Sequence, residues 1–134
     1  MSHNCNFALI QCIDFRFRAM TEKFGVDLFK TSDFDLYSWP GAAKKLADDD
    51  TRSAAMRDID ICIGLHSAEN IAIVSHMDCG AYGGSKAFAS PDEEKKVLTR
   101  DLHTARDLIL EKHTNVKVET YLLDHNVGDQ FLSV

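Results

Sequence analysis

Residues 70–80, Asn70-Ile-Ala-Ile-Val-Ser-His76-Met-Asp-Cys79-Gly80, join the most strand-like segment of the chain to a cluster of polar side chains. The β-branched residues of this segment stand at alternate and at adjacent positions, as expected of a strand that is buried on both faces. Such strands are typical of parallel sheets covered by helices. The stretch therefore predicts an α/β fold with polar groups at the carboxyl end of one strand.

Segments on both sides alternate between strand and helix patterns. Further strands are predicted at Phe7–Cys12, Asp35–Trp39 and Val116–Leu123. Helices are predicted from Arg16 to Phe24, where Gly25 stops the first, from Thr51 to Leu65, and from Ser90-Pro91 through Ile109. A turn at His125–Gly128 leads to a segment ending at Leu132. We expect a mainly parallel central sheet of about four strands, flanked by helices, with an antiparallel edge strand at the C-terminus.

The 134 residues carry 15 Lys and Arg against 21 Asp and Glu, a net charge of −6. This length predicts a single domain over residues 1–134. The acidic balance argues against nucleic acid as a partner, and no apolar run approaches the length of a membrane span. Met1–Asn6 lacks the pattern of a secretory signal, and the cysteines are too few and too scattered for a disulfide scaffold. We expect a cytoplasmic protein.

Two of the predicted strands end in chemically unusual residues. Cys12 closes the first strand, and His76 and Cys79 follow the third. If these strands are neighbours, the three side chains converge at the carboxyl edge of the sheet, where α/β proteins bind ligands. One imidazole and two thiolates suit Zn²⁺ and leave its fourth position open. Taken singly, Cys12 reads as an apolar residue of a buried strand and His76 as a hydrogen-bonded strand end.

The two clusters together resemble the β-class carbonic anhydrases. The family pattern Cys-x-Asp-x-Arg, followed downstream by His-x-x-Cys-Gly, is met by Cys12-x-Asp14-x-Arg16 and by His76-x-x-Cys79-Gly80. The resemblance covers nearly the whole chain. It implies that Cys12, His76 and Cys79 bind Zn²⁺ and that Asp14 and Arg16 form a catalytic pair beside the metal.

The residue types suit these roles. Zinc with two thiolates acidifies bound water less than an all-histidine site, so Asp14 is useful as an acceptor that orients the nucleophile. Arg16 has the planar fork that can hold this carboxylate away from the metal. The backbone N–H groups of Gly80 and Ala81, at a turn entering a helix, are candidates for binding an anionic product.

The resemblance implies zinc-dependent, reversible hydration of carbon dioxide to bicarbonate and a proton by zinc-bound hydroxide, in a homodimer or higher homo-oligomer. Ile13, Phe15 and the pair Trp39-Pro40 are more apolar than the family's usual residues and predict a narrower, more apolar pocket. One alternative, which the resemblance to carbonic-anhydrase-like hydrolases permits, is a hydrolase of carbonyl sulfide or carbon disulfide at the same zinc site. Another is a catalytically idle zinc- or anion-binding homologue in which Asp14 closes the site.

The other candidate ligands receive structural roles. Cys5 is expected near a loose terminus and Cys62 on a helix core face. Asp78 is expected to form hydrogen bonds behind the ligands or in the turn. Surface or packing positions are expected for the remaining histidines, His3, His66, His103, His113 and His125.

Overall fold

Strand β3 (Asn70–His76) lies in the middle of a five-stranded sheet with the order β2-β1-β3-β4-β5. The computed structural model describes residues 3–134. The other strands are β1 (Phe7–Cys12), β2 (Phe34–Trp39), β4 (Lys117–Asp124) and β5 (Gln130–Ser133). The helices are α1 (Arg18–Phe29), α2 (Lys44–Ala47), α3 (Arg52–His66) and α4 (Pro91–Lys112). Three single 3₁₀ turns, η1 (Gly80–Tyr82), η2 (Ser85–Ala87) and η3 (His125–Val127), complete the list.

The sheet confirms the predicted fold class. Strands β1 to β4 pair in parallel, and only β5 runs antiparallel, against β4. Strands β1 and β3 are direct neighbours, with Ile10 opposite Ile73. This neighbour relationship places the ends of both strands, and the residues that follow them, at one edge of the sheet.

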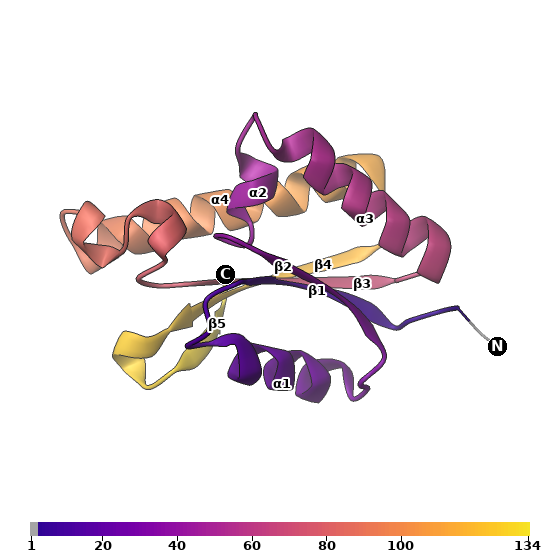
Figure 1. Cartoon of the computed structure of the whole chain (residues 1–134), viewed down its shortest axis with the longest axis horizontal. Coiled ribbons are helices and arrows are strands. Elements are labelled where there is room, and N and C mark those ends of the chain that lie inside the picture. Colours follow the sequence, from indigo (N-terminus) through magenta and orange to yellow (C-terminus); the bar gives the residue numbers. More distant parts are fainter. Residues whose placement is uncertain (1–2) are drawn as a thin grey trace.

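Helices cover both faces of the sheet (Figure 1). Helix α1 lies on one face, and α2, α3 and α4 lie on the other. Because all six residues of β1 are buried, each face contributes to its own apolar cluster. Ile10 packs into the cluster under α3 and α4, whereas Leu9 packs into the cluster under α1. Burial on both faces explains why β1 and β3 read as nearly continuous apolar runs.

Helix α1 differs from its prediction at both ends. It begins at Arg18 rather than Arg16, and it continues through Gly25 to Phe29. Gly25 is buried, and a Cβ atom there would lie 3.2 Å from Cε2 of Phe7. The glycine therefore allows the helix to approach β1 closely instead of ending the helix.

Helix α4 begins as the sequence predicts. The Ser90 hydroxyl accepts a hydrogen bond from the Glu93 N–H at 3.1 Å, and Pro91 occupies the first turn. The helix extends to Lys112, three residues beyond the predicted Ile109. The short helix α2 was not predicted, since Lys44–Ala47 is a single turn without a cap signal.

Two expectations concern the ends of the chain and the membrane. The sequence predicts no secretory signal at Met1–Asn6. The first two residues of this stretch lie outside the described part of the chain. Within residues 3–134, none of the helices has both the length and the apolar character needed to cross a bilayer.

Candidate metal centre

Cys12, His76 and Cys79 meet at the carboxyl edge of the sheet. Their ligating atoms lie within 4.8 Å of one another, and all three residues are buried. The two sulfur atoms are 3.8 Å apart. Two sulfurs bound to one tetrahedral zinc ion at its usual bond length are separated by about 3.8 Å. The spacing of the thiols therefore fits the metal that the sequence predicts.

The imidazole of His76 is held in the orientation of a metal ligand. Its Nδ1 atom donates a hydrogen bond to the Met77 carbonyl at 2.7 Å, which leaves the Nε2 lone pair free. This Nε2 atom is buried and has no hydrogen-bond partner among the described residues. Because a buried nitrogen without a partner is costly, the arrangement fits a metal ligand for an electrophile such as a zinc ion.

The two thiols form one strongly coupled pair. The hydrogen bond from Cys79 lowers the pKa of Cys12, and contacts with His76 and with the Gly41 N–H act in the same direction. The same interaction with Cys12 raises the pKa of Cys79. The pair thus favours one thiolate at neutral pH, and a divalent cation would favour the second.

Asp14 and Arg16 lie immediately beside the cluster. Arg16 donates to both carboxylate oxygens of Asp14, with the shortest contact 2.7 Å from Nη2 to Oδ2. These hydrogen bonds hold the pKa of Asp14 below its usual range. The Oδ2 atom also lies 3.6 Å from Nε2 of His76. The structure therefore brings the predicted pair and the predicted ligands together.

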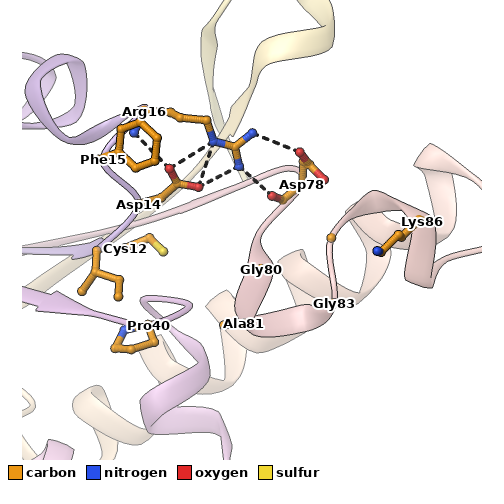
Figure 2. A pocket seen from close by; sticks show the side chains of 12 residues that line it. Cys12, Asp14, Phe15, Arg16, Pro40, Asp78, Gly80, Ala81, Gly83 and Lys86 are labelled. Carbon is orange, nitrogen blue, oxygen red and sulfur yellow. Dashed lines mark hydrogen bonds and ion pairs between the residues drawn. The ribbon is translucent and has the colours of Figure 1, made fainter.

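Arg16 has a second carboxylate partner, as Figure 2 shows. Its Nη1 atom donates to Oδ2 of Asp78 at 3.1 Å, and Nη2 donates to the Asp78 carbonyl at 3.0 Å. Asp78 has a left-handed backbone, with φ of 57°, and its N–H donates to the buried carboxylate of Glu94 at 2.6 Å. Asp78 is thus a hydrogen-bonding residue of the turn, which is one of the two expected roles, and it does not lie behind the ligands because it lines the pocket. The sequence did not indicate the contact of Asp78 with Glu94.

A pocket of about 840 Å³ opens over Cys12, while His76 and Cys79 lie beneath its wall with 3% exposure each. Ile13 and Phe15 line it with exposed side chains, and Figure 2 shows Phe15 next to Asp14 and Arg16. The other lining residues are Asp14, Arg16, Pro40, Asp78, Gly80, Ala81, Gly83, Gly84 and Lys86. The candidate metal centre is therefore reached from solvent through a partly apolar entrance.

The wall formed by Trp39-Pro40 differs in part from expectation. Pro40 lines the pocket, but Trp39 is 5% exposed, belongs to the apolar core and stacks on Tyr37 with a ring separation of 5.3 Å. The indole therefore supports the wall from behind. Gln11 is a feature that sequence reasoning did not single out, since both atoms of its buried side-chain amide lack partners among the described residues.

Gly80 and Ala81 line the pocket, in the three-residue turn η1 rather than at the start of a long helix. Hydrogen bonding from the Ala81 and Tyr82 N–H groups works to lower the pKa of Cys79, which shows that these groups face its sulfur. The N–H of Ala81 thus has a thiol partner. Anion binding at Gly80 and Ala81 stays a prediction.

Three of the other cysteines and histidines lie in the core or in ion pairs. Cys62 is fully buried in the core, as expected, and burial raises its pKa to about 12. His66 and His113 each have a carboxylate partner that the sequence did not reveal, Asp35 at 2.7 Å and Asp60 at 2.7 Å.

Comparison with known proteins places this fold among the carbonic anhydrases. The structure superposes on the carbonic anhydrase of Streptococcus mutans with a TM-score of 0.67 and 14% identity, covering 100% of this chain and 85% of that one. Tetrameric β-carbonic anhydrases of Sordaria macrospora give 0.63 and 13%, with coverage of 100% and 82%. A carbon disulfide hydrolase gives 0.58 and 16%, with coverage of 98% and 79%. These likenesses establish the shared fold.

Sequence comparison establishes the family. The family described as "Putative carbonic anhydrase" matches residues 2–131, and the chain belongs to it. An uncharacterized protein of Rickettsia bellii is 33% identical over 121 residues, which are 86% of this chain and 74% of that protein. A second, from Rickettsia conorii, is 34% identical over 121 residues. That match spans 86% of this chain and 65% of the relative.

Proposed function

We propose that this protein is a zinc-dependent carbonic anhydrase, which converts carbon dioxide and water reversibly into bicarbonate and a proton. The observation that carries the proposal is the buried cluster of Cys12, His76 and Cys79, with an unpaired Nε2 atom beside the Asp14 carboxylate. When bound there, zinc supplies a Lewis acid that makes water a nucleophile near neutral pH.

The chain's own residues would supply a hydrogen-bond acceptor for the attacking water, hold that acceptor in position and give the substrate access to the site. Asp14 accepts a hydrogen bond from the attacking water and aims its lone pair at the carbon atom. Arg16 keeps Asp14 ionised and restrains it from binding the metal, because the guanidinium donates hydrogen bonds to both carboxylate oxygens of Asp14. Of the two predicted N–H groups, that of Gly80 is left to bind a bicarbonate oxygen, because the Ala81 N–H faces the Cys79 sulfur. The released proton passes to solvent through the open pocket.

Stopped-flow hydration of carbon dioxide by the zinc-loaded protein tests this function. We expect a rate well above the buffer reaction, and Asp14→Asn should reduce it at unchanged zinc content. A fully loaded protein that gives only the buffer rate contradicts the proposal. If that protein is also inert toward other substrates, it is an idle zinc-binding homologue.

Hydrolysis of carbonyl sulfide or carbon disulfide is the second candidate function. The apolar entrance favours it, since Ile13 is 55% exposed, Phe15 is 87% exposed and Pro40 completes the wall. These substrates are less polar than bicarbonate and would enter past such side chains readily. Measuring both sulfide release and carbon dioxide hydration separates the two functions, because only hydrolysis of carbonyl sulfide or carbon disulfide produces sulfide.

We further propose a homodimer or higher homo-oligomer. A phenyl ring as exposed as that of Phe15, adjacent to the exposed Ile13, favours burial against another copy of the chain. Sedimentation should show an assembly at micromolar concentration, and Phe15→Ser should weaken it. A monomer at all accessible concentrations would contradict this assembly.

We also propose a cytoplasmic location, and the chemistry of the thiols supports it. Cys12 and Cys79 are free, and their sulfurs are only 3.8 Å apart. In an oxidising compartment a small movement would allow a disulfide, which would remove both ligands. We expect mild oxidation to release zinc and thiol reductant to restore binding. Zinc that stays bound after the disulfide has formed would contradict this ligand set.

A further inference from the structure

A second group of metal-ligating side chains lies at the amino edge of the sheet, opposite the candidate metal centre. Cys5 precedes β1, Asp35 is the second residue of β2, and His66 ends α3. Their ligating atoms lie within 4.8 Å of one another. Since β1 separates the two edges, this cluster is about 20 Å from the candidate centre. Figure 1 shows the N-terminal segment leaving the sheet beside the end of α3.

The backbone already holds these three residues together. The Cys5 N–H donates to the His66 carbonyl at 2.9 Å, which ties the N-terminal segment to the end of α3. The next N–H, from Asn6, donates to the Asp33 carbonyl at 3.3 Å, just before β2. The side chains of Asp35 and His66 meet with Nδ1 2.7 and 2.9 Å from the two carboxylate oxygens. The cluster is therefore prearranged by three segments distant in sequence.

A fourth donor stands next to the group. The ring of His3 lies 6.5 Å from that of His66, centroid to centroid, with the planes inclined by 56°. Two imidazoles on one tetrahedral zinc ion have centroids about 5 Å apart. His3 would complete the set by moving about 1–2 Å, a small shift for a residue that precedes the first strand.

An ordinary surface ion pair is the competing interpretation, and the chain contains one for comparison. His113 and Asp60 also meet at 2.7 Å, but there Lys112 supplies a cation at 2.6 Å. Within residues 3–134, no lysine or arginine forms an ion pair with Asp35. In place of a cation, the thiol of Cys5 lies beside the Asp35–His66 pair. Burial is the main cause that raises the pKa of this thiol, and the Asp35 charge adds to it. Asp35 thus lacks the nearby cation that balances Asp60.

We propose that Cys5, Asp35 and His66, with His3 as the fourth donor, form a second zinc site of structural type. A thiolate, a carboxylate and imidazoles are ligands that zinc accepts in tetrahedral sites. Zinc at this position would fasten the N-terminal segment to edge strand β2 and to the end of α3. The site is separate from the proposed catalytic centre and has no part in its chemistry.

Zinc stoichiometry of the dialysed protein tests the proposal. We expect two zinc ions per chain in the native sequence, one in Cys5→Ser, one in Asp35→Asn and two in the matched control His113→Gln. Circular dichroism checks that each variant is folded. One zinc ion in both the native protein and Cys5→Ser would overturn the proposal. One zinc ion that Cys5→Ser loses and Cys79→Ser keeps would instead support this site and overturn the catalytic centre.

A measurement on the native sequence avoids dependence on variants. Each cysteine is alkylated by iodoacetamide, with and without zinc, and its modification rate is followed by mass spectrometry. We expect zinc to slow modification of the half-buried Cys5 at least tenfold while Cys62 stays unchanged. Equal rates at Cys5 in the presence and absence of zinc would overturn the second site, whatever happens at Cys12 and Cys79.

Discussion

The Nε2 atom of His76 lies 3.6 Å from Oδ2 of Asp14, and both groups are largely buried. Arg16 holds the same oxygen, because its Nη2 atom donates a hydrogen bond to Oδ2 at 2.7 Å. We therefore expect a nucleophilic water beside the ligands to have Asp14 as its hydrogen-bond acceptor, while Asp14 does not itself bind the metal. We expect the balance between these two contacts to determine whether the proposed metal site is open.

Removing the guanidinium should close the site. In Arg16→Ala, Asp14 is free to turn toward the ligand atoms, and we expect the rate of carbon dioxide hydration to fall at least about 100-fold with zinc retained. Arg18→Ala is the control, since that side chain is 66% exposed and its one ion pair among residues 3–134 is with Glu22. Parallel assays of rate and zinc content decide the matter. Full activity in Arg16→Ala would show that Asp14 needs no restraint.

His76→Gln should remove one zinc ion per chain. The substitution deletes the Nε2 atom, which has no hydrogen-bond partner among the described residues and lies 3.6 Å from the Asp14 carboxylate. His103→Gln is a matched control, because Nε2 of His103 is also buried without a described partner but belongs to no cysteine cluster. Metal analysis by mass spectrometry gives the count. Equal zinc content in the two variants would argue against His76 as a ligand.

Two glycines in helices should respond to alanine with opposite signs. At Gly25 a new Cβ atom would meet the fully buried ring of Phe7 at 3.2 Å, so overpacking should outweigh the gain in helix propensity and cost about 1 kcal/mol. At Gly64 in α3 nothing lies within 4 Å, and Gly64→Ala should stabilise by about 0.5–1 kcal/mol. Urea denaturation measures both. Stabilisation by both substitutions would mean that α1 can move away from β1.

Asp60 should contribute stability that depends on pH. Burial works to raise its pKa, but Lys112 and His113 outweigh burial, so the folded pKa lies below the unfolded value. The contribution is then fully present above the unfolded pKa of about 4 and is lost as pH falls through the folded pKa. Asp60→Asn should cost about 0.5–1 kcal/mol at pH 7.

The difference between Asp60→Asn and the native protein should shrink below pH 4. Urea denaturation across this range tests the sign. Asp107→Asn is the control, because the Asp107 carboxylate is 67% exposed and pairs only with its neighbour Arg106. A cost for Asp60→Asn that grows toward low pH would contradict the assignment.

The parts of the fold that could be predicted are those that local patterns encode. Strands β1 and β3 are buried on both faces and read as apolar runs, and Ser90-Pro91 marks the start of α4 through local hydrogen bonding. The role of Gly25 could not be read in this way. The same residue type ends helices and permits close packing, and only the position of Phe7 distinguishes the two.

The site, too, has parts that the sequence predicts and parts that it does not. Cys12, His76 and Cys79 could be placed together because parallel neighbouring strands bring their carboxyl ends to one edge. The bond from Arg16 to Asp78 joins residues 62 positions apart and depends on the left-handed backbone of Asp78, for which the sequence has no separate signal. The group around Cys5 was missed because its members come from three segments at the opposite edge.

The pairing of β1 with β3 would also determine when the proposed centre can acquire metal during synthesis of the chain. Cys12 leaves the ribosome long before Cys79, and the two thiols come together only after Asn70–His76 has docked beside Phe7–Cys12. Parallel neighbours form late because the intervening chain must first cross over the sheet. The nascent chain therefore presents Cys12 without its partner thiol until Cys79 has been made, and we expect loading of the proposed centre to follow the docking of β3 beside β1.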